Sequence, residues 1–103
     1  MPLSLPPKSE WVIGDFNGML ESDLLCLSHR DTVKTANGSE VRLLVGLSLT
    51  AFDEDADDVG NRDDIFASGI VEISPPEAQC RGSIWSLRLD SNGIRHESDL
   101  QKA

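Results

Sequence analysis

The strongest chemical signal in this chain is an acidic block at residues 53–64. It packs seven carboxylates and one arginine into twelve residues of a 103-residue chain whose net charge is −9. Unpaired carboxylates at that density would lose too much hydration energy if they were buried. The block therefore has three possible roles: a solvated loop, a cation site, or a contact for a basic partner.

Part of the block has the spacing of a calcium-binding loop. Asp53, Asp55 and Asp57 match the first, third and fifth positions of an EF-hand loop, and Asp64 matches the twelfth. The sixth position is Asp58 rather than glycine, and the segment joins predicted strands rather than helices. These four aspartates are the candidate metal ligands of a looser calcium loop. The alternative is a solvated acidic loop that binds no cofactor.

A protein partner is the other possibility for the acidic block. An acidic inhibitor or immunity-type protein could use such a loop to occupy a basic site on its partner, and that contact would weaken with salt. The chain has only nine lysines and arginines. Nucleic acids and anionic membranes attract clustered basic residues, so we expect neither as a partner.

The residue types of a Cys₂His₂ zinc site are present in Cys26, His29, Cys80 and His96. Structural zinc sites usually take their ligands from closely spaced pairs, and this set has none. Two cysteines so far apart, in a chain without a recognisable secretory signal, favour buried free thiols in the cytoplasm. We therefore expect no zinc and no disulfide.

The sequence contains few candidate catalytic residues. Serine, histidine and aspartate occur together in residues 28–31 and 96–99, but adjacent side chains on a strand point to opposite faces. The chain has no Gly-x-Ser-x-Gly elbow, no H-E-x-x-H motif and no phosphate-binding glycine loop. The sequence therefore predicts that the protein is not an enzyme.

Apolar residues alternate with a period of two over residues 41–52, 65–73 and 84–89, which predicts strands. In the last two strands Val71, Leu87 and Leu89 should face the core, whereas Glu72 and Arg88 should face solvent. The longer first strand should place Val41, Leu43, Val45, Leu47, Leu49 and Ala51 inward.

Two Asn-Gly pairs predict tight hairpin turns. The first should pair residues 32–35 with residues 41–44, and the second should pair residues 85–89 with residues 94–98. Residues 11–13 and 24–27 predict two further strands near the N-terminus. Short strands at this spacing indicate a barrel or a sandwich.

Several large apolar residues fall on strand faces opposite the predicted core. One interpretation is an exposed patch for self-association or for a protein partner. The interpretation that we favour is a second core layer, in which residues 11–29 cover them. The candidate partner-binding residues are Leu44, Phe52, Phe66, Ile70 and Ile84.

Three prolines among the first seven residues predict an extended or disordered tail over residues 1–9. The remaining residues, 10–103, have the length of a single domain. We therefore expect a single β-barrel domain after the tail.

The C-terminal half carries a recognisable order of short motifs. Gly46-Leu47-Ser48-Leu49 leads to residues 67–71, then to Trp85–Leu89, to Asn92-Gly93 and to a closing segment at residues 97–100. This order resembles small SH3-like barrels of the Tudor and KOW kind. The resemblance implies an all-β SH3-like barrel with an N-terminal β-strand extension, acting as a non-catalytic binding or assembly module. The half lacks both the aromatic cluster of a methyl-lysine cage and the basic surface of an RNA-binding barrel.

Overall fold

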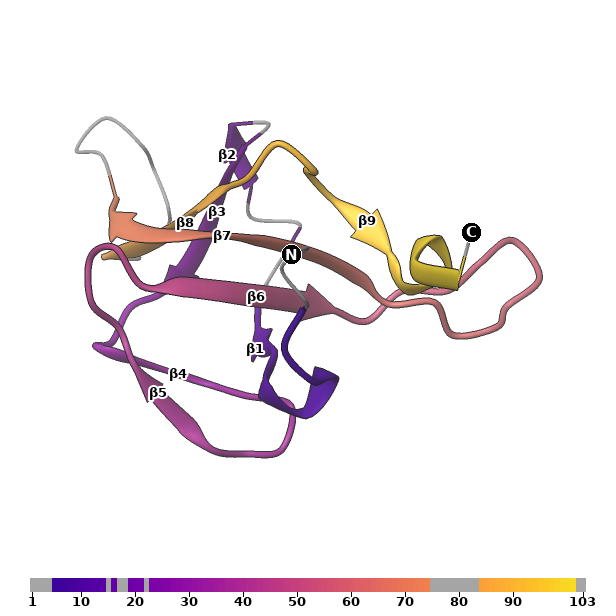
Figure 1. Ribbon diagram of the computed structural model, residues 1–103, viewed down its shortest axis with the longest axis horizontal. Coiled ribbons are helices and arrows are strands. Elements are labelled where there is room, and N and C mark those ends of the chain that lie inside the picture. Colours follow the sequence, from indigo (N-terminus) through magenta and orange to yellow (C-terminus); the bar gives the residue numbers. More distant parts are fainter. Residues whose placement is uncertain (1–4, 15, 17–18, 22, 75–83, 102–103) are drawn as a thin grey trace.

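The computed structural model describes residues 5–14, 16, 19–21, 23–74 and 84–101. These residues form β-strands and two short 3-10 helices, η1 (Lys8–Glu10) and η3 (Glu97–Gln101) (Figure 1). The strands are β1 (Val12–Ile13), β2 (Met19–Glu21), β3 (Leu24–Ser28), β4 (Thr32–Lys34), β5 (Glu40–Arg42), β6 (Ser48–Asp53), β7 (Ile65–Ile73), β8 (Trp85–Leu89) and β9 (Arg95–His96). The expected all-β class is confirmed. No helix in the described part of the chain is long and apolar enough to cross a membrane.

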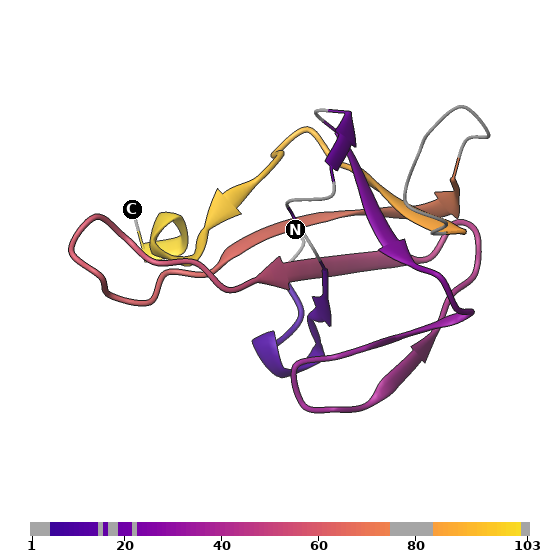
Figure 2. The ribbon, with the colours of Figure 1, turned by 180° about the vertical axis from the view of Figure 1, so that it is seen from behind.

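A curled seven-stranded sheet holds most of the chain, in the order β1-β6-β7-β8-β3-β2, with β9 beside β7 (Figures 1 and 2). Its pairs are antiparallel except for β1 with β6, which run parallel. The hairpin of β4 and β5 forms a second sheet, which a bridge between Val12 and Thr35 ties to β1. The curled sheet and this hairpin together form a half-barrel.

The predicted strand over residues 41–52 is two strands, β5 and β6. The chain turns between them at Gly46, whose φ of 91° is a conformation that glycine adopts readily. The turn keeps Leu43 in the core but exposes Val45, so the prediction that Val45 faces inward is wrong. Strands β7 and β8 lie where the alternation predicted them.

The first predicted hairpin is confirmed, and the second is wrong. Strand β4 pairs with β5 around Asn37-Gly38, with Val33 opposite Val41. After the turn at Gly93, however, β9 pairs with β7 rather than with β8. Both edges of β8 are already occupied, by β7 and by β3. Strand β9 therefore takes the part of β7 that β8 leaves unpaired.

The main core lies on one face of the sheet. Val71, Leu87 and Leu89 are buried in it, as predicted. On the other face Glu72 and Arg88 are partly exposed and form an ion pair of 2.8 Å. The alternation of β7 and β8 therefore predicted both faces correctly at these positions.

A second, aromatic cluster covers part of the opposite face. Trp11 stacks on Phe66, with ring centroids 4.8 Å apart, and tilts against Phe52. Leu5 packs against the same cluster. Phe66 is therefore completely buried and Phe52 keeps only 7% of its surface exposed, so neither belongs to an open apolar patch on this face. The second core layer that we favoured is the correct interpretation for these two residues.

Part of the segment predicted as a tail packs against the domain. Residues 1–4 lie outside the described residues, but residues 5–9 pack against the domain. Besides the contact of Leu5, the indole N–H of Trp11 donates to the carbonyl oxygen of Pro6 at 2.8 Å. Three prolines do prevent an α-helix here, but Trp11 and Lys8 tie the segment to the sheet.

Cys26 on β3 is disulfide-bonded, so the predicted free thiol is wrong at this position. The other cysteine, Cys80, lies outside the described residues. Sequence spacing alone carried no signal for this bond, because a disulfide requires that two backbones approach each other in space.

Replacing Leu87 with alanine should lower the free energy of unfolding by roughly 2–5 kcal/mol, because truncating a buried leucine leaves a cavity. Arg88→Ala should cost about 1 kcal/mol or less, since its ion pairs with Glu72 and Asp23 are partly exposed. Urea unfolding of both variants measures the difference. Equal losses would contradict the assigned faces of β8.

Candidate functional site

The acidic block forms an arm that projects from one end of the sheet, and η3 lies beside it (Figure 1). We call residues 54–63 the acidic arm. Its two sides are joined by a bridge between Ala56 and Arg62, and the N–H of Asp57 donates to the carbonyl oxygen of Asn61 at 2.8 Å. The arm is therefore a hydrogen-bonded hairpin.

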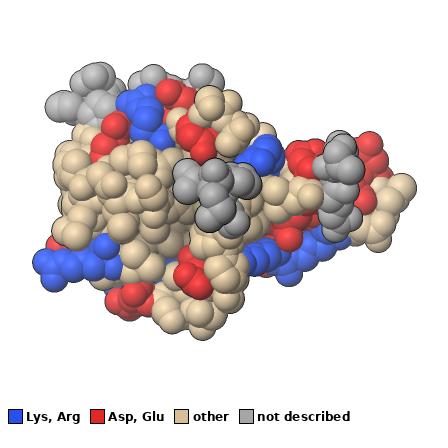
Figure 3. Space-filling view, in the orientation of Figure 1, with Lys and Arg blue, Asp and Glu red and all other residues tan. Residues whose placement is uncertain are grey.

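The tip of the arm is held by Asp57. One of its carboxylate oxygens accepts hydrogen bonds from the backbone N–H groups of Val59 and Asn61, at 3.0 and 2.9 Å. Gly60 closes the turn with a φ of 87°. Val59 is 81% exposed, and Asp58 beside it is also exposed. Figure 3 shows that Asp and Glu atoms gather at this projecting end.

One carboxylate of the block is completely buried, contrary to our expectation for the whole block. Asp64 has no exposed surface, and Arg62 donates to its two oxygens at 2.9 and 3.0 Å. Lys8 donates to the same group at 2.8 Å. These bonds, first from Arg62 and then from Lys8, outweigh the effect of burial and lower the pKa of Asp64 to about 2. Two cations thus make the burial of this charge possible.

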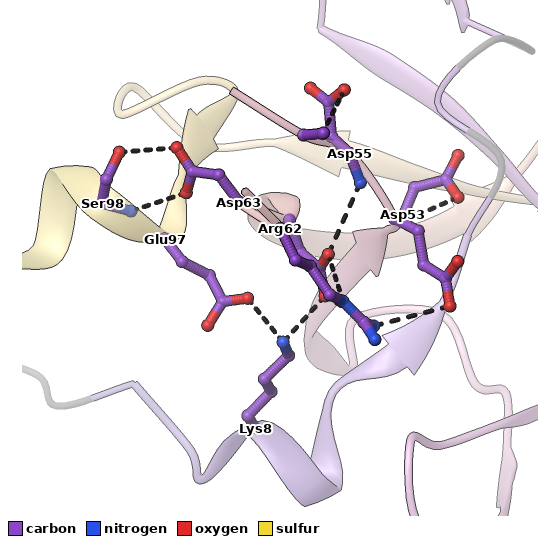
Figure 4. A network of polar contacts seen from close by, with 10 residues as sticks. Lys8, Asp53, Asp55, Arg62, Asp63, Glu97 and Ser98 are labelled. Atoms are coloured by element: carbon purple, nitrogen blue, oxygen red, sulfur yellow. Dashed lines mark hydrogen bonds and ion pairs between the residues drawn. The ribbon is translucent and has the colours of Figure 1, made fainter. Parts of the chain in front are cut away.

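Lys8 and Asp63 connect the arm to the C-terminal segment (Figure 4). Lys8 also contacts the carboxylate of Glu97. Asp63 accepts hydrogen bonds from the backbone N–H and the hydroxyl of Ser98, at 2.9 and 2.8 Å. The base of the arm is consequently attached to both η1 and η3.

His96 on β9 provides a further connection. Its Nε2 lies 2.8 Å from a carboxylate oxygen of Asp55. This hydrogen bond raises the pKa of His96 and lowers the pKa of Asp55. Both side chains are partly exposed, so the pair orients the arm more than it stabilises the fold.

The four candidate calcium ligands do not converge. Asp53 accepts from the backbone N–H groups of residues 16 and 54. Asp55 contacts His96, Asp57 holds its own turn, and Asp64 is neutralised by Arg62 and Lys8. Within the described residues, no group of three or more His, Cys, Asp or Glu side chains is placed to hold a metal ion. The calcium interpretation has no support from this geometry.

The other partner-binding candidates, Leu44, Ile70 and Ile84, are exposed. Leu44 lies in the turn after β5, Ile70 is opposite Arg88, and Ile84 precedes β8. All three lie outside the acidic arm, so they do not form one site with the acidic block.

The hydroxyl groups of the two possible catalytic serines donate to oxygen atoms. The hydroxyl of Ser28 donates to the carbonyl oxygen of Thr32, and that of Ser98 donates to Asp63. His96 contacts Asp55 instead of Ser98.

A groove that the sequence did not predict lies at the base of the arm. Its volume is about 440 Å³, and η1, β1, the β4–β5 turn and the start of the arm contribute to it. Its lining includes Ser9, Ile13, Asn37, Phe52, Glu54 and Arg62. These residues are spread over the first 62 positions without a shared motif, so no local signal could have revealed the groove.

Comparisons with protein-family models, with curated proteins and with solved structures found no match to this chain.

Proposed function

We propose that this protein is a non-catalytic binding module whose acidic arm contacts a basic surface of a partner protein. The observation that carries the proposal is the construction of the arm. Its exposed carboxylates Glu54, Asp57 and Asp58 stand on a hydrogen-bonded hairpin that is anchored at its base by Lys8 and Arg62.

A pre-shaped charged arm favours association in two ways. Its negative potential steers a basic partner toward it and raises the association rate. Because the turn at Asp57 is already formed, little conformational freedom is lost on binding. Both effects support a protein partner over the calcium site, whose candidate ligands point in different directions.

We also propose that the half-barrel is related in architecture to SH3-like barrels. The order β6, β7, β8 in one curled sheet supports this interpretation. In such a module the barrel acts as a scaffold, and loops such as the acidic arm select the partner.

The disulfide at Cys26 bears on the compartment. Disulfides persist in oxidising compartments and are rare in the reducing cytoplasm. We therefore propose an oxidising compartment as the working environment, in place of the cytoplasmic location that the sequence suggested.

The proposal is tested by affinity capture from native extract followed by mass spectrometry. Wild-type protein should retain a partner at low salt and release it at roughly 0.5 M NaCl, because screening shortens the range of the arm's charges. The double variant Asp57→Asn, Asp58→Asn should retain much less of the same partner. Asparagine at position 57 keeps the oxygen that holds the turn, so the comparison isolates charge.

The matched control is Asp31→Asn, Glu40→Gln, which removes two exposed charges that belong neither to the arm nor to the two short helices attached to its base. It should capture the partner as well as wild type does. Equal losses in both double variants would show that net charge alone is responsible and would contradict the proposal. Capture that requires Ca²⁺ and disappears with a chelator would favour the calcium module instead.

A further inference from the structure

The groove at the base of the arm combines an apolar floor with hydrogen-bond donors. Ile13 is 51% exposed although it lies on a strand, and it lines the groove together with Phe52. The volume of about 440 Å³ falls within the range of about 300–1,000 Å³ that is usual for small ligand sites. An aliphatic side chain would bury apolar surface against this floor.

Three hydrogen-bond donors of the groove have no partner among the described residues. The side-chain oxygen of Asn37 accepts from Ser39 and Thr35, which turns its NH₂ group away from them. Arg62 uses Nε and one terminal nitrogen on Asp64, so its other terminal nitrogen has no partner among the described residues. The hydroxyl of Ser9 likewise has no partner among the described residues. Such groups suit the carbonyl oxygens of a peptide backbone.

The charges around the groove favour a basic ligand over an anionic one. Lys8 and Arg62 both pair with Asp64, and Lys8 also pairs with Glu97, so two carboxylates balance these two cations. Glu54 stands at the groove with a side chain that is 77% exposed, 3.5 Å from Arg62. It is also the first carboxylate of the acidic arm, so the negative potential of the arm continues into the groove.

We infer that this groove docks a short segment of the partner protein in which an aliphatic side chain stands beside a basic one. The aliphatic side chain packs on Ile13 and Phe52, the backbone carbonyl oxygens accept from Asn37 and Arg62, and the basic group pairs with Glu54. This inference rests on the proposed function, because it assigns to the same partner a contact next to the arm.

The test is a nuclear magnetic resonance titration of the whole protein with three capped tripeptides. Acetyl-Lys-Leu-Lys-amide should shift the amide signals of Ile13, Ala36 and Asn37. The peptide with serine in place of leucine should bind about tenfold more weakly, because it buries less apolar surface. The peptide with glutamates in place of both lysines should not bind, because Glu54 repels it.

Variants of the protein make the test specific. Ile13→Ser should weaken the leucine peptide about tenfold. Its matched control is Ile73→Ser, because Ile73 is 52% exposed at the end of β7 and does not line the groove. The control should leave binding unchanged, and the melting temperature of each variant verifies that it is folded. Glu54→Gln should also weaken the lysine peptides.

Three outcomes would overturn the inference. They are equal binding of the leucine and serine peptides, signal shifts confined to residues 57–60, and no signal shift at all. If partner capture still depends on Asp57 and Asp58 in these cases, the proposed function survives without the groove. If capture does not depend on them, the proposed function fails separately.

Discussion

Replacing Gly69 with alanine should destabilise the protein more than the same change at any other described glycine. Gly69 lies in the middle of β7, opposite Leu49 of β6 and Leu89 of β8. A Cβ atom built on it would lie 2.1 Å from the backbone oxygen of Arg88 and 2.7 Å from the backbone carbon of the same residue. Backbone atoms of a central strand cannot rotate away as a side chain does.

The clash must therefore be relieved by moving β7 away from β8. That movement breaks ladder hydrogen bonds and opens the main core, in which Val71 and Leu87 pack. Overpacking a core typically costs about 1–3 kcal/mol and occasionally more. Because a central strand must shift here, we expect a loss of about 3 kcal/mol or more in the free energy of unfolding, measured by urea denaturation.

Gly38→Ala is the matched control. Gly38 has a φ of 87° in the β4–β5 turn, and a Cβ atom there would meet no atom within 4 Å. This change should cost only about 1–2 kcal/mol, from the left-handed backbone conformation. A Gly69→Ala variant as stable as Gly38→Ala would show that β7 and β8 are not as close as the structure places them.

The second large effect is expected at Asp64. Asp64→Ala removes the only buried carboxylate of the block and leaves Lys8 and Arg62 facing each other without it. Breaking a buried ion pair on one side costs about 3–5 kcal/mol. Both cations are partly exposed and can rehydrate, so we expect the lower end of this range. Asp58→Ala, at the exposed tip, should change stability by less than about 0.5 kcal/mol.

The pH dependence of stability offers an independent check on Asp64. Its pKa is lowered from 3.8 to about 2 in the folded protein, so folding favours the ionised carboxylate. This contribution, roughly 2 kcal/mol, is complete above about pH 4 and is lost as the pH falls through about 2. Asp64→Asn should flatten the stability curve between these values. If the stability of this variant fell with pH as steeply as that of the wild type, Asp64 would not be paired in the folded state.

Local signals in the sequence located strands β7 and β8 and one turn. The alternation of apolar residues located β7 and β8 because the side chains of a strand point to its two faces in turn. Asn37-Gly38 located the hairpin of β4 and β5 because this pair readily adopts the positive φ angles of a tight turn. The acidity of the arm was equally plain, since charge density requires no knowledge of distant residues.

Contacts between distant segments decided the rest. Asp64 is buried because Lys8, 56 positions earlier, reaches it, and no local pattern encodes that meeting. Strand β9 pairs with β7 because β3 had already taken the free edge of β8. The groove likewise exists only where η1, β1, the β4–β5 turn and the arm come together. Edge occupancy and long-range charge pairing belong to the folded chain as a whole, so only the tertiary structure could determine them.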